Sequence, residues 1–354
     1  MGIEIVPVNN PQGLLLYNRF PELVYRGTFK APPFPGDGLA GNWRDALFGG
    51  VKAQLFLAFM NGKAAGRIAA ALHAGEQGRE VGYFGYFETL PRREVARALL
   101  AAAADWLADR DVQVMVGPVD LTPHERVGLL VEGFEEFHLP GMPYNPPYYR
   151  QLLEAGGLEL AMELRAYAGD LRQALPERLV KVAERAAANP LRLRELDVNN
   201  LASEGEVFSL VHNGSMPGIW GFVPLSPAEG AAIWHRLIKH YDPALILVAE
   251  MAGSPAGLCL TLAAAGGNPG RPMARLRAAR LAVLAVLPEY RFKGVEAALI
   301  LEAVRRLRQR KILLLELSQV AASNRMMNKL IRNMGVLYCS KIYHVYQQRL
   351  PVHN

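Results

Sequence analysis

The stretch VLPEYRFKGVEAAL, residues 286–299, decides the predicted fold. It overlaps an apolar run with the composition of a buried strand, LAVLAVL at 281–287, and leads into an apolar pattern of helical period. Arg291 and Gly294 stand in the turn between the two. The first turn of a helix presents unpaired backbone N–H groups, and the helix dipole adds positive potential there. The sequence therefore predicts an anion-binding turn of the kind that holds a pyrophosphate, with Gly294 letting the backbone approach the anion.

The chain contains an internal repeat. Residues 55–66, LFLAFMNGKAAG, and residues 246–257, ILVAEMAGSPAG, share an apolar run, an alanine and two glycines at equal spacing. Each copy predicts two strands joined by a tight turn. A second pair of segments, NPPYYRQLLEAG at 145–156 and NRMMNKLIRNMG at 324–335, runs from Asn to Gly with helical periodicity, and each precedes a strand. The sequence therefore predicts two copies of one domain.

Both halves show the same predicted order of elements: a strand, a hairpin, a strand, a helix, a strand, a helix and a final strand. The helices at 91–110 and 295–310 hold equivalent places in that order. A chain of 354 residues fits two domains of about 150 to 200 residues each. The predicted boundaries are a first domain at 1–172, a helical linker at 173–190 and a second domain at 191–354.

These features resemble tandem proteins of the GNAT superfamily of N-acyltransferases. The coenzyme A loop of that superfamily follows the fourth strand with the pattern Val-x-Pro-x-x-Arg-Gly-x-Gly-x-Gly/Ala, which Val286, Pro288, Arg291 and Gly294 match. Four segments resemble bacterial two-domain GNAT proteins: GRIAA (66–70), VGYFGYFE (81–88), GLLVEGF (128–134) and MPYNPPYY (142–149). The resemblance covers nearly the whole chain. It implies an α+β fold of two tandem GNAT-like domains, each a mixed, mostly antiparallel sheet flanked by helices, joined by a helical linker.

The resemblance also implies that acetyl-CoA or another acyl-CoA is the co-substrate and that the second domain holds it. The implied cofactor-binding residues are Leu284, Val286, Arg291, Phe292, Lys293, Gly294, Val295, Glu296, Ala297 and Asn324. Phe292 replaces the first Gly of the pattern, and Glu296 replaces its last small residue. A carboxylate beside a pyrophosphate weakens binding by like-charge repulsion. In the first domain, Glu94 stands at the place of Gly294, so this domain is expected to shape the acceptor cleft instead.

Acyl transfer to an amine needs a base for the amine proton and an acid for the leaving thiolate. Glu316 is the candidate base, because it interrupts the apolar run ILLLELS on the strand expected beside the acyl group. Ser318 is the second candidate catalytic residue. Many GNAT enzymes have a Tyr seven residues after the Asn of the fourth helix, where this chain has Leu152 and Ile331. These substitutions leave the acid of the reaction unassigned.

Rigid aromatic side chains beside amides suit recognition of a ligand. The segment PYNPPYYR and the loop NGSMPGIWGF have this composition. The candidate substrate-binding residues are Tyr144, Asn145, Tyr148, Tyr149 and Trp220.

The composition, 51% hydrophobic and 20% charged residues, is that of a globular protein. No apolar run reaches the ~18 residues that span a bilayer, and no signal peptide is visible, so a cytoplasmic protein without a membrane partner is expected. The two cysteines, Cys259 and Cys339, have no spacing typical of metal ligands, so no metal is expected. A net charge of +6 and a pI of about 9.3 fit a phosphate-bearing cofactor, an anionic substrate or RNA.

The predicted function is acyl-CoA-dependent N-acyl transfer to the amine of a small molecule or peptide. Two alternatives stay open. The departures at Phe292, Glu296 and Ile331 fit a non-catalytic protein that binds an acyl-CoA or a related metabolite. Fem-type aminoacyl-tRNA-dependent transferases also have two GNAT-like domains. Only under that alternative is a nucleic acid, tRNA, expected as a partner, and its binding would depend steeply on salt.

Overall fold

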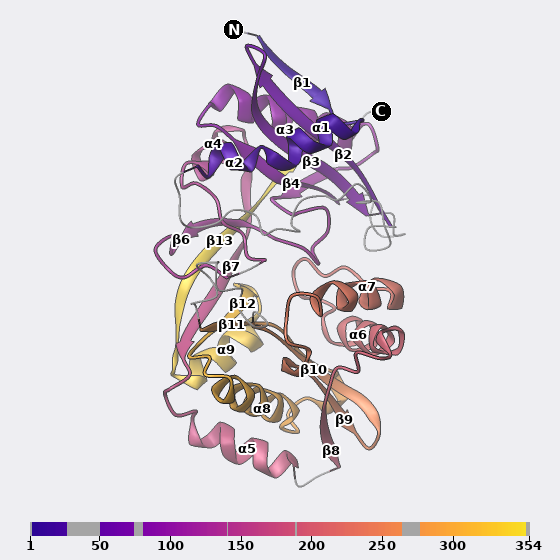
Figure 1. Cartoon of the computed structure of the whole chain (residues 1–354), viewed down its shortest axis with the longest axis vertical. Coiled ribbons are helices and arrows are strands. Elements are labelled where there is room, and N and C mark those ends of the chain that lie inside the picture. The colour runs from indigo at the N-terminus through magenta and orange to yellow at the C-terminus, as the bar shows by residue number, and fades with distance from the viewer. Residues whose placement is uncertain are drawn as a thin grey trace. The chain divides into compact units, whose positions relative to one another are not determined.

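The computed structural model describes residues 2–26, 50–73, 81–139, 141–187, 190–263 and 277–351. The chain divides into two compact units (Figure 1). Unit 1 consists of Met1–Leu164 together with Lys341–Asn354, and unit 2 consists of Arg165–Ser340. The C-terminal residues therefore belong to the unit that the N-terminal half builds.

Unit 1 is a sheet covered by helices on both faces. Its elements are β1 (Ile3–Pro7), β2 (Val51–Met60), β3 (Lys63–His73), β4 (Val81–Thr89), β5 (Val114–Gly117), β6 (Leu129–Glu132), α1 (Pro11–Arg19), α2 (Pro21–Val24), α3 (Arg93–Ala108) and α4 (Tyr149–Ala155). Strands β1 to β4 are antiparallel neighbours, and β5 runs parallel to β4. Helix α3 packs on one face over Ile68 and Phe84, and α1 packs on the other with Tyr17 over Leu55.

Unit 2 repeats this plan. Its elements are β7 (Glu159–Asp170), which begins in unit 1, α5 (Glu177–Ala187), β8 (Leu191–Glu195), α6 (Leu201–Ser215), α7 (Pro227–Leu237), the 3₁₀ turn η2 (Pro243–Leu245), β9 (Ile246–Met251), β10 (Ser254–Ala263), β11 (Ala278–Val286), the 3₁₀ turn η4 (Pro288–Tyr290), α8 (Val295–Gln309), β12 (Leu314–Ala321), α9 (Arg325–Met334) and β13 (Leu337–Arg349), which ends in unit 1. Strands β8 to β11 are antiparallel neighbours, and β12 runs parallel to β11. Helices α6 and α7 lie side by side, as do α5 and α8 (Figure 1). The mixed, mostly antiparallel sheets of the sequence prediction are confirmed in both units.

The repeated hairpins are confirmed by their turns. The β2–β3 turn consists of Asn61 and Gly62, and the β9–β10 turn consists of Ala252 and Gly253. All four residues have positive φ, between 51° and 84°. Two residues of positive φ make the type I′ turn whose twist matches that of the flanking strands. The two sequence copies therefore build the same local structure.

The ends of the two halves are exchanged between the units. In unit 1, β13 pairs antiparallel with β5 from Tyr346 to Arg349. In unit 2, the backbone N–H of Leu171, just after β7, donates to the carbonyl of Leu313 at 2.8 Å. Helix α5, inside the predicted linker, packs its Ala183 against α8. The compact units thus differ from the contiguous domains expected at 1–172 and 191–354 by these terminal strands.

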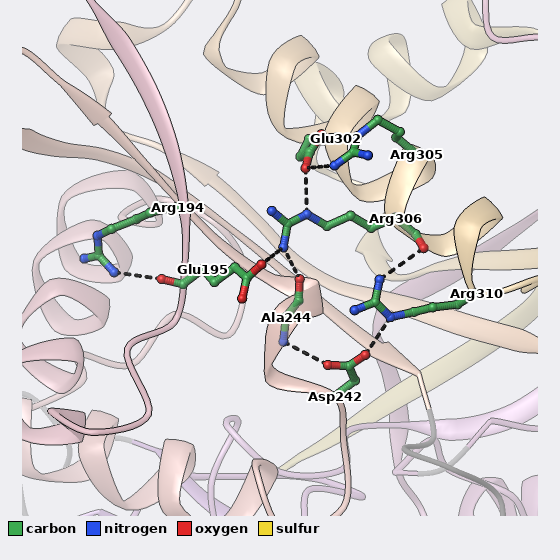
Figure 2. A network of polar contacts seen from close by, with 8 residues as sticks. All are labelled: Arg194, Glu195, Asp242, Ala244, Glu302, Arg305, Arg306 and Arg310. Atoms are coloured by element: carbon green, nitrogen blue, oxygen red, sulfur yellow. Dashed lines mark hydrogen bonds and ion pairs between the residues drawn. The ribbon is translucent and has the colours of Figure 1, made fainter.

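A polar network attaches the C-terminal half of α8 to β8 and η2 (Figure 2). The guanidinium of Arg306 donates at 2.6 Å to Glu195, to Glu302 and to the carbonyl of Ala244. One turn later, Arg310 donates to Asp242 at 2.6 Å, and the other oxygen of this carboxylate accepts from the N–H of Ala244. The helix whose N-terminus forms the predicted anion-binding turn is therefore anchored at its other end.

Candidate functional site

Strands β11 and β12 separate part of the way along their length. They pair over four residues, ending with Leu281 opposite Leu317, whereas β11 continues to Val286 and β12 to Ala321. Beyond the last pair, residues 283–286 of β11 remain paired with β10. The separated edge presents backbone N–H and C=O groups to which an extended ligand can add as a further strand.

The turn after β11 has the predicted strand–turn–helix geometry. Helix α8 begins at Val295, with Gly294 as its N-cap at φ 83°. Phe292 has φ 60°, in the left-handed region that glycine adopts easily and other residues rarely. It stands where the superfamily pattern has its first Gly, so a backbone conformation that favours glycine is found here without one. Phe292 is 88% exposed.

The two basic side chains of the turn have different surroundings. The Arg291 guanidinium donates to the carbonyls of Val286, at 3.1 Å, and Ser215, at 2.8 Å. Arg291 therefore holds the turn against β11 and the end of α6. Lys293 is exposed, and its ammonium lies 5.5 Å from the centroid of the Tyr290 ring. Lys293 is thus the better placed of the two to meet an anion from solvent.

Gly294 and Glu296 both shape the N-terminus of α8. A Cβ on Gly294 would lie 2.9 Å from the Cβ of Ala186 and 3.0 Å from the carbonyl of Val182, both in α5. Helix packing and positive φ therefore account for this glycine without a ligand. The Oε2 atom of Glu296 is buried and has no hydrogen-bond partner within the described part of the chain. The carboxylate is thus held near the helix N-terminus, where it opposes binding of an anion.

The predicted catalytic residues lie on β12 beside one arginine. Glu316 and Ser318 are buried, and Glu316 is the ladder partner of Arg280 on β11. The Arg280 guanidinium donates to the backbone carbonyl of Ser318 at 3.0 and 3.1 Å and to the Ser318 hydroxyl at 3.2 Å. Asn324, predicted to bind cofactor, accepts a hydrogen bond from the N–H of Met327 and caps α9. The side chains of the remaining predicted cofactor residues pack in the core of unit 2: Leu284, Val286, Val295 and Ala297.

A second polar cluster, in unit 1, gathers predicted substrate residues around Glu88 at the end of β4. The hydroxyl of Tyr149 donates to Glu88 Oε2 at 2.7 Å, and that of Tyr25 lies 3.0 and 3.1 Å from the two carboxylate oxygens. Tyr149 also accepts from the Thr89 N–H, and Tyr148 donates to the Thr89 carbonyl, both at 2.8 Å. The predicted aromatic segment therefore converges on a carboxylate.

The surroundings of Glu88 are unusual for a carboxylate. Burial raises the pKa of the Glu88 carboxyl, against the lowering effect of Arg67 and of the hydrogen bonds from Tyr149 and Tyr25. Arg67, only 3% exposed, is the ladder partner of Glu88, and its guanidinium lies 4.8 Å from the Tyr17 ring centroid. Arg67 Nε and the Tyr17 hydroxyl are buried without hydrogen-bond partners among the described residues. The cluster therefore retains unused hydrogen-bonding capacity.

The other predicted substrate residues have separate roles. The Tyr144 ring lies 5.3 Å from His138, whose pKa burial and nearby cations lower to about 3, so that the imidazole is neutral. The Asn145 amide accepts from the N–H of Leu130 and donates to its carbonyl, at 2.7 and 3.1 Å, and so attaches its segment to β6. Trp220 lies in unit 2, half-buried after α6. The structure thus brings Tyr144, Tyr148 and Tyr149 together and leaves Trp220 in the other unit.

Sequence reasoning missed Glu88, Arg67 and Tyr25. A signal existed for two of them. Arg67 interrupts the apolar segment GRIAA, and Glu88 ends the aromatic segment VGYFGYFE. Antiparallel pairing of these two strands brings the charges opposite each other. The part played by Tyr25 depends on how α2 packs on β4, which local patterns do not encode.

Two negative findings apply to the described ranges. Within them, no helix combines the length and the apolar character needed to cross a membrane. In the same ranges, no group of three or more His, Cys, Asp or Glu side chains is arranged to hold a metal ion.

The chain matches no protein-family model. It is 30% identical to the bacterial ceramide synthase of Caulobacter vibrioides (strain NA1000 / CB15N) in an alignment 279 residues long that covers 73% of this chain and 70% of the relative. The chain belongs to the bacterial ceramide synthase family. It is also 26% identical to Protein YghO of Escherichia coli (strain K12) in an alignment 321 residues long that covers 84% of this chain and 82% of that protein.

Solved structures with the same fold support the predicted architecture of this family member. A tandem GNAT protein from the clavulanic acid biosynthesis pathway superposes over 100% of both chains with a TM-score of 0.60 at 14% identity. A GCN5-related N-acetyltransferase from Sphaerobacter thermophilus covers 99% of this chain and 97% of its own, with a TM-score of 0.55 at 16% identity. The tandem GNAT fold predicted from the sequence is therefore confirmed.

Proposed function

We propose that this chain is an acyl-CoA-dependent N-acyltransferase that joins a fatty acyl group to a long-chain amino alcohol. The relationship to bacterial ceramide synthase carries the proposal. A ceramide is the amide of a fatty acid and a long-chain amino alcohol. An enzyme that makes such an amide must hold an acyl donor and an amine. The tandem GNAT fold suits this task, because it provides two sheets with different side chains around them.

Unit 2 is the proposed acyl-CoA site. The pantetheine arm would pair with the edge of β11 beyond Leu281, and the pyrophosphate would meet the N-terminus of α8 and the Lys293 ammonium. The thioester would then lie at the point where β11 and β12 separate. Arg280 stands one residue before that point. Its positive charge suits the negative charge that develops on the thioester oxygen during attack.

The proposed reaction is direct transfer. The neutral amine nitrogen attacks the thioester carbonyl carbon, the C–N bond forms and the C–S bond breaks. The nitrogen gives up one proton to a base, and the departing thiolate takes one up, so that the products are an amide and free CoA. Glu316, beside Arg280 on the neighbouring strand, stays the candidate base of this scheme, and Ser318 stays a second candidate.

The test is an assay with purified protein, palmitoyl-CoA and sphinganine. Formation of the amide is followed by mass spectrometry and release of CoA by a thiol reagent. We expect one amide per CoA released, and a higher KM for palmitoyl-CoA in Lys293→Glu. Binding of acyl-CoA without transfer to any amine would instead favour the non-catalytic alternative. If Lys293→Glu leaves the rate of acyl transfer and the KM for palmitoyl-CoA unchanged, the acyl-CoA does not bind at this turn of unit 2.

A further inference from the structure

We propose that Glu88 and the tyrosines around it form the site in unit 1 that binds the ammonium group of the amine acceptor. This inference rests on the proposed function for the identity of its ligand. Glu88 is half-buried as a residue, and its carboxylate accepts hydrogen bonds from Tyr25 and Tyr149. An ionised carboxylate offers about four lone-pair positions, so two hydroxyl donors leave room for a cation. An alkylammonium brings three N–H donors and the charge that a carboxylate favours.

The aromatic rings of the cluster add to this recognition. Tyr25 and Tyr144 have ring centroids 6.4 Å apart, and Tyr148 and Tyr149 have centroids 5.1 Å apart. Aromatic faces attract cations, and they pack against the alkyl chain that follows the ammonium. The site therefore fits a primary amine with an apolar body better than a free, hydrated cation.

The buried groups with unused capacity point to a ligand that also carries oxygen. Arg67 Nε and the Tyr17 hydroxyl are buried donors without partners among the residues described here. Arg67 is the ladder partner of Glu88, so a cationic donor lies next to the carboxylate. An amino alcohol has the matching pair of groups, an ammonium for Glu88 and a hydroxyl oxygen for these donors.

Comparison of the two copies shows that the fold does not require these charges. The residue after the last glycine of the repeat is Arg67 in unit 1 and Leu258 in unit 2. Their partners across the ladder are Glu88 and Ala285. Leu258 and Ala285 are buried and apolar at the equivalent rung. Charged side chains taken out of water cost desolvation free energy, and apolar residues fill this rung in the other copy. The charged pair in unit 1 is therefore better explained by a ligand.

The experiment measures binding of octylamine and of its neutral counterpart octanol by calorimetry, without acyl-CoA. We expect octylamine to bind more tightly than octanol, and Glu88→Gln to weaken octylamine binding by about tenfold or more, with octanol unchanged. Glu132→Gln, an exposed carboxylate change in the same unit, is the matched control and is expected to have no effect. Equal binding of the two probes, or equal effects of the two substitutions, would overturn the proposal.

Two measurements keep this test independent of folding and of the proposed function. In the wild-type protein, octylamine binding is expected to fall as the pH drops through the carboxyl pKa, because the amine stays protonated throughout that range. Binding that does not change over that range would contradict the site even if Glu88→Gln fails to fold. Palmitoyl-CoA binding and transfer are measured separately. If no acyl transfer is detected but octylamine binding depends on Glu88, the proposed acyltransferase activity is rejected and the ammonium site is supported. If acyl transfer is detected but octylamine binding does not depend on Glu88, the activity is supported and the ammonium site is rejected.

Discussion

Glu296 is the residue at which the candidate acyl-CoA site departs most from the superfamily pattern. Its carboxylate lies at the N-terminus of α8 and is partly buried there. We expect Glu296→Ala to tighten binding of CoA by about two- to fivefold, the scale of a charge interacting with a helix end. Calorimetric titration with CoA measures the change. Glu289→Ala removes an exposed charge outside α8 and is expected to have a smaller effect. Unchanged or weaker binding in Glu296→Ala would place the pyrophosphate elsewhere.

Glu88 makes the stability of unit 1 depend on pH. Its pKa is raised above the ordinary 4.5 by burial, and Arg67, Tyr149, Tyr25 and Arg126 reduce the shift. The folded state therefore holds the proton to higher pH than the unfolded state. Its contribution to stability is present below the unfolded pKa and is lost as pH rises through the folded pKa. We expect the unfolding free energy of wild type minus that of Glu88→Gln to fall as pH rises from 4.5. Urea unfolding at several pH values measures this difference, and a constant or rising difference would contradict the raised pKa.

Individual residues show which parts of the candidate site could be predicted from the sequence. The turn after β11 follows from the sequence, because Arg291 and Gly294 stand between a strand run and a helix run. The reason for Gly294 does not, since it depends on where α5 packs. Glu88 was missed for a similar reason. Its importance arises from Tyr25 and Tyr149, which lie 63 and 61 residues away along the chain.

At the level of elements, we expect the contacts of the half-buried Arg306 to stabilise α8 more than the exposed salt bridge of Arg305 does. The Arg306 side chain is 15% exposed and joins Glu302, Glu195 and the Ala244 carbonyl (Figure 2). The neighbouring Arg305 is 52% exposed and contacts Glu302. We expect Arg306→Ala to lower the free energy of unfolding by about 1–3 kcal/mol, because it removes the guanidinium that donates to the part-buried Ala244 carbonyl, to Glu195 and to Glu302.

Arg305→Ala is the control for this network, with an expected loss of about 0.5 kcal/mol or less, since exposed ion pairs contribute little. Urea unfolding of both variants compares them directly. Equal losses would mean that the network in Figure 2 does not anchor α8.

The elements themselves were predictable because their signals are local. Three of the four hairpin-turn residues, Asn61, Gly62 and Gly253, accept positive φ readily, and the helices 93–108 and 295–309 have one apolar face. The separation of β11 from β12 has no such local signal. Apolar alternation shows that a strand forms, but it does not show where two strands stop pairing.

At the scale of the whole molecule, the exchanged strands are the feature that local sequence could not reveal. Each half reads as a complete copy of the domain, ending in its own strand. In the structure, unit 1 is completed by residues 341–354, and residues 165–170 belong to unit 2. Either terminal strand can satisfy the hydrogen bonds of a sheet edge. Which of the two strands completes unit 1 is therefore decided by packing between segments far apart in sequence.

The exchange predicts that the C-terminal residues stabilise the N-terminal sheet. Tyr343, Val345 and Tyr346 are buried in unit 1, and β13 pairs with β5 there. We expect truncation after Ser340 to leave the amides of β5 (Val114–Gly117) unprotected in hydrogen exchange, because they lose a neighbouring strand and the core beneath it. The amides of β9 and β10 in unit 2 should keep their protection, since their ladder lies wholly within residues that remain.

Truncation after Pro351 is the control for that experiment, since it retains every residue of β13, and it should leave β5 protected. Mass spectrometry of peptides that cover β5 and β9 reads both regions in one sample. If β5 stays protected without residues 341–354, the N-terminal half folds without the exchanged strand, and unit 1 is the contiguous domain that the sequence alone predicts. If β5 loses protection while β9 keeps it, the sheet of unit 1 depends on the C-terminal strand, whereas the β9–β10 ladder of unit 2 holds without it, and the two copies differ in what completes them.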